Sequence, residues 1–124
     1  MSLPLFAEAL IRELALEAEK RVGPERSAIE ALTGEIRTLG ETLNQLARKE
    51  LREMDLVHVL SRIKAGFDDE QVLAASRRAQ ETCASFFSAA RQKRAPHPEL
   101  LLNQLVTDIE SVMLSLVHAV TKSF

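Results

Sequence analysis

The chain has 124 residues, of which 46% are hydrophobic and 27% are charged, and its formal net charge is −2. This size and composition exclude a disordered chain and predict a single helical-bundle domain over residues 1–124. A net charge so close to zero gives no general attraction to nucleic acid or to anionic lipid. Cys83 is the only cysteine, so no intramolecular disulfide can form and we expect a cytoplasmic protein.

The composition also predicts the fold class. Aromatic residues make up only 4% of the chain, and four Gly and four Pro are too few for a loop-rich β-protein. We therefore predict an all-α fold, an up-and-down bundle of about four helices. The first twenty residues lack the basic region of a signal peptide. The most apolar stretch, Leu100 to Val120, contains Asp108 and Glu110, so we expect no membrane insertion.

The first predicted helix starts at the chain's N-terminus. Ser2 is a suitable N-cap, and Pro4 falls in the first turn, where its missing N–H costs nothing. Gly23 and Pro24 end this helix, and Pro24 opens the next one.

The second predicted helix carries a narrow apolar seam between residues 25 and 48. Such a 3-4 spacing forms one stripe on a helix and requires a partner helix to cover it. Because no Gly or Pro lies between Glu41 and Ala65, we favour one long helix to Ala65 with a shift of phase; a break near Lys49 to Glu53 is the alternative. We interpret Gly34 and Gly40 as tolerated surface glycines, with close helix approach as the alternative. The seam residues are Ile29, Leu32, Ile36, Leu39, Leu43 and Leu46.

The next boundary is predicted at Gly66, as a C′ glycine, followed by Asp68 as the N-cap of a third helix over about 69–94. A fourth helix, about 98–122, repeats the seam. Because it is apolar over most of its circumference, we expect it to be central in the bundle or covered by a second subunit, and we favour a homodimer. Its seam residues are Leu102, Leu105, Ile109, Val112 and Leu116.

Few residue patterns in the chain indicate a metal-binding, catalytic or phosphate-binding site. Asp55 and His58 have the carboxylate-x-x-His spacing of metal-binding bundles, but a second such motif is missing. Cys83 lies on an apolar face with no base nearby, as an inert thiol would. We therefore expect no catalytic residue, no cofactor and no metal. Basic residues that could contact phosphates are Arg77, Arg78, Arg91, Lys93 and Arg94.

One stretch resembles a known family. Residues Leu39 to Arg48, LGETLNQLAR, resemble the Gly-x-Asn-Leu-Asn-Gln-Ile-Ala-Arg stretch of plasmid mobilisation (MobC-like) relaxosome proteins, with Thr42 in place of the family's Asn. The resemblance covers about ten of the 124 residues. It implies a DNA-associated accessory role at a plasmid transfer origin.

From the residue patterns alone, we expect a non-enzymatic interaction protein: a regulator, an adaptor or a secretion-chaperone-like module. It would act through self-association or by binding a partner helix, with the two seams as its surfaces. The alternative is a nucleic-acid-associated accessory protein such as a plasmid mobilisation factor.

Overall fold

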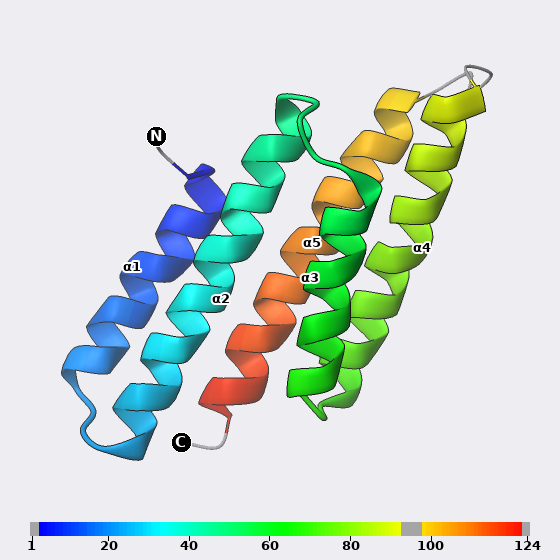
Figure 1. The fold of residues 1–124 in the computed structure, drawn as a ribbon. Coiled ribbons are helices and arrows are strands. Elements are labelled where there is room, and N and C mark those ends of the chain that lie inside the picture. The colour runs from blue at the N-terminus through cyan, green and yellow to red at the C-terminus, as the bar shows by residue number, and fades with distance from the viewer. Residues whose placement is uncertain (1–2, 93–97, 123–124) are drawn as a thin grey trace. The chain divides into compact units, whose positions relative to one another are not determined.

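Five helices make up the computed structural model, which describes residues 3–92 and 98–122 (Figure 1). No strand occurs within those two ranges, so the predicted all-α class is confirmed. The number of helices is five rather than about four, because the predicted second helix is divided in two. The helices are α1 (Leu5–Glu19), α2 (Pro24–Ala47), α3 (Glu53–Gly66), α4 (Glu70–Gln92) and α5 (Pro98–Thr121).

The chain divides into two compact units, each described here by itself. The first consists of Met1–Glu50 and Leu116–Phe124, and the second of Leu51–Ser115. One boundary lies in the connection between α2 and α3, and the other lies within α5. The prediction of one domain over residues 1–124 stays a prediction.

In the first unit, α1 and α2 form a helical hairpin (Figure 1). As predicted, the turn is made by Gly23, which has φ +67°, and by Pro24, which is the first residue of α2. A positive φ suits glycine because it has no Cβ. The ion pair between Arg21 Nη1 and Glu25 Oε2, at 2.9 Å, spans this turn on the surface. Ser2, the predicted N-cap, lies outside the described residues, and Pro4 precedes the first turn of α1.

Gly40 of α2 lies close to α1. A Cβ atom at this position would lie 3.0 Å from Ala7 Cβ and 3.3 Å from Leu3 Cδ2, whereas one at Gly34 would meet nothing within 4 Å. The interpretation of both residues as surface glycines therefore holds for Gly34 and is wrong for Gly40. Because Ala7 Cβ is fixed to the backbone of α1, a larger residue at position 40 forces the two helices apart.

The two glycines give a matched pair of variants. Gly34→Ala should raise the free energy of unfolding by about 1 kcal/mol, since alanine is the better helix former and has free space there. Gly40→Ala should lose that gain to the contact with Ala7 and lower the free energy of unfolding by about 1 kcal/mol. Urea unfolding of both variants measures this difference. Equal stabilisation by the two substitutions would show that α1 does not pack closely on Gly40.

The break between α2 and α3 is made by Lys49, which has a left-handed φ of +61°. Its N–H donates to the carbonyl of Leu46 at 3.1 Å, and the N–H of Glu50 donates to the carbonyl of Gln45 at 2.9 Å. These two bonds are those of a Schellman motif, which closes the C-terminus of a helix. The favoured continuous helix to Ala65 is therefore wrong, because the last carbonyls of α2 are already bonded by residues that have left the helix.

In the second unit, α3 and α4 form a second hairpin whose two ends are tied by side chains. Glu53 Oε1 at the start of α3 accepts from Arg91 Nη1 at the end of α4, at 2.7 Å. Lys64 Nζ near the end of α3 donates to Gln80 Oε1 of α4, at 3.2 Å. These pairs place the two helices antiparallel. Leu56 and Leu60 of α3 are fully buried.

The turn between α3 and α4 differs from the prediction by one residue on each side. Gly66 is the last residue of α3 and has no positive φ, and the extended Phe67 occupies the C-cap. The N-cap of α4 is Asp69 rather than Asp68, because Asp69 Oδ1 accepts from the N–H groups of Gln71 and Val72, at 2.9 and 3.1 Å. A carboxylate in this position satisfies two of the free N–H groups at the start of a helix.

Candidate functional sites

Asp108 of α5 is the one buried carboxyl group among residues 3–92 and 98–122. Thr82 of α4 donates its hydroxyl to Asp108 Oδ2 at 2.6 Å, and Gln104 donates its amide to Asp108 Oδ1 at 2.8 Å. Each carboxyl oxygen therefore has a donor, which is what a buried polar group needs to avoid a large desolvation cost. The contact with Thr82 joins α5 to α4 near the middle of both helices.

The outer face of α5, defined by its exposed residues between Leu100 and Thr121, includes no Asp, Glu, Lys or Arg. Between Leu100 and Thr121 the acidic residues are Asp108, which is buried, and Glu110, which is half-buried. Leu100 is 63% exposed and Leu114 is 51% exposed on the same helix. The other exposed residues of this stretch are Asn103, Gln104, Thr107 and His118.

Unlike the outer face of α5, the surfaces of α1 and α2 in the first unit carry exposed charged residues. α1 exposes Arg12, Glu13 and Glu19, and α2 exposes a charged residue in almost every turn. A helix surface without charge but with exposed leucines is the composition that protein–protein interfaces have at their centre. The outer face of α5 is therefore the strongest candidate for a binding surface.

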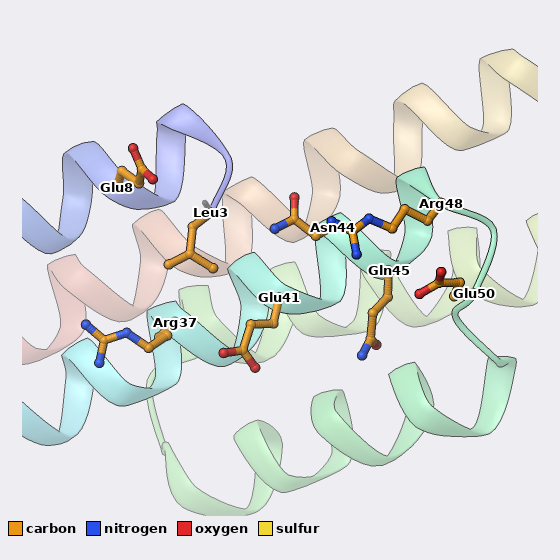
Figure 2. A pocket seen from close by; sticks show the side chains of 8 residues that line it. All are labelled: Leu3, Glu8, Arg37, Glu41, Asn44, Gln45, Arg48 and Glu50. Atoms are coloured by element: carbon orange, nitrogen blue, oxygen red, sulfur yellow. The ribbon is translucent and has the colours of Figure 1, made fainter. Parts of the chain in front are cut away.

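A polar groove lies on the first unit, with a volume of about 500 Å³ (Figure 2). Leu3 and Glu8 line it from the α1 side. The carboxylates of Glu8, Glu41 and Glu50 outnumber the guanidinium groups of the two arginines, which disfavours binding of a phosphate backbone. Its lining includes no histidine and no nucleophile, so the groove suits binding rather than catalysis. The remaining lining residues are Arg37, Glu41, Asn44 and Gln45 of α2, its C-cap Arg48, and Glu50.

The stretch that resembles mobilisation proteins contributes to both the core and this groove. Its apolar residues Leu39, Leu43 and Leu46 are buried, and Gly40 packs against α1. Its residues Glu41, Asn44, Gln45 and Arg48 line the groove (Figure 2). Buried apolar residues and groove-lining polar residues alternate along this stretch because a helix turns once every 3.6 residues.

The predicted seams are buried within one copy of the chain. All six seam residues of α2 have relative exposures of 6% or less, and Leu105, Ile109, Val112 and Leu116 of α5 are fully buried. Leu102 is half-buried. A partner could therefore reach these side chains only after the residues that cover them moved.

The predicted basic residues are not all brought together. Arg77 and Arg78 are exposed on α4, and Arg91 is also exposed but is paired with Glu53. Lys93 and Arg94 lie outside the described residues. The expectation of nucleic-acid contact through this set stays a prediction.

The residues considered for metal binding lie on α3. Asp55 is paired with Arg52, at 3.2 Å between Oδ2 and Nε, and His58 is exposed. In the part of the chain that the structure describes, no group of three or more His, Cys, Asp or Glu residues could hold a metal ion.

One helix has the length and composition that a membrane span requires, within the described ranges: Glu99–Thr121 of α5. Apolar core helices of soluble proteins meet the same two criteria, so this is weak evidence for a span. No protein-family model, curated protein or solved structure matches this chain.

The apolar pattern predicts that α5 is central or covered by a second subunit, but it does not predict which of its residues stay exposed, and it does not predict the groove. The seam residues were assigned as surfaces, although apolar residues at that spacing more often fill a core. The feature of the sequence that indicates an uncharged surface on α5 is the scarcity of charged residues in this helix. A helix that has only two charged residues between Leu100 and Thr121 must leave an uncharged surface once Asp108 faces the core.

Cys83 is fully buried on α4. Burial raises the pKa of its thiol from the ordinary value of 9.0 to about 11, and the negative charge of Glu53 adds to this effect. Because desolvation disfavours the thiolate, the side chain stays protonated and unreactive at neutral pH. This agrees with the inert thiol that the apolar surroundings indicate.

The raised pKa predicts a loss of stability in alkali. A thiol that ionises less readily in the folded state contributes stability that is fully present below about pH 9 and is lost as pH rises through about 11. Urea unfolding at pH 8 and pH 11 should therefore show a larger loss for the wild type than for Cys83→Ala, by roughly 1–2 kcal/mol. The variant is the control for lysine titration, which both proteins share. The same pH dependence in both would contradict the assignment.

Proposed function

We propose that this is a non-enzymatic helical interaction protein of the cytoplasm, a regulator, adaptor or secretion-chaperone-like module that acts through self-association. The observation that carries the proposal is the uncharged outer face of α5, with Leu100 and Leu114 exposed on it. Interface centres are depleted of charged residues and enriched in apolar contact area. The two hairpins support the predicted up-and-down order of helices, which is part of the proposal.

The position of the proposed surface differs from the one predicted from the sequence. The seams of α2 and α5 are filled within one chain, so they are expected to hold the fold rather than a partner. The remaining surface of α5 has no counterpart of the ion pairs that cover α1 and α2, such as Arg26 with Glu30. An uncharged helix surface gains from leaving water, because no charge has to be desolvated.

The proposal is tested by the solution mass of the purified protein. Light scattering over a range of concentrations should show a species approaching twice 13.8 kDa as concentration rises. Because the proposed contact is uncharged, raising the salt concentration should not dissociate the dimer, whereas an interface of ion pairs would weaken. A mass of one chain at every concentration and salt condition would contradict self-association.

A further inference from the structure

We draw no further inference here: the strongest candidate, the outer face of α5 around the exposed residues Leu100, Thr107 and Leu114, already belongs to the proposed function, and nothing in the structure shows what covers it.

Discussion

The hydrogen bond between Thr82 and Asp108 is the interaction on which the second unit and the outer face of α5 depend. An acidic residue in the middle of an apolar helix must either face water or find donors inside the protein. Here both oxygens of the carboxyl group have donors, at 2.6 and 2.8 Å, one of them from the neighbouring helix. The bond therefore favours the observed rotation of α5 about its own axis relative to α4, because another rotation would separate Asp108 from Thr82.

The same rotation decides which residues of α5 remain on the surface. With Asp108 inside, the side of the helix about 100° away from it shows Leu100, Thr107 and Leu114, which carry no charge. Such a face is unfavourable in water but suits contact with a matching surface. One buried polar contact thus links the packing of the fold to the proposed mode of self-association. Leu5 and Leu16 of α1 are also exposed, at 80% and 58%, but on that helix they lie among the exposed charges of Arg12, Glu13 and Glu19.

Much of the fold could be predicted from local patterns, and the errors have local causes. The Gly23–Pro24 turn, the start of α5 at Pro98 and the buried seams follow from turn chemistry and helical periodicity. The break at Lys49 could not be predicted in the same way, because a left-handed C′ position is usually glycine and lysine there costs roughly 1–2 kcal/mol. The role of Gly40 depends on how closely α1 approaches, which periodicity does not determine. The sequence predicts that α5 is central or covered by a second subunit, but not which of its residues stay exposed: spacing shows which residues share a face, whereas the packing around Asp108 decides which face is buried.

The central claim is that Asp108 is held by Thr82, and a double-mutant cycle tests it most directly. The free energy of unfolding would be measured for the wild type, Thr82→Val, Asp108→Ala and the double variant, because alanine leaves no acceptor for the hydroxyl of Thr82. If the two side chains are bonded in the core, the effects should not add, and the coupling energy should be about 1 kcal/mol or more. A coupling energy near zero would mean that Asp108 does not depend on Thr82, and the assignment of the outer face of α5 would then lose its basis.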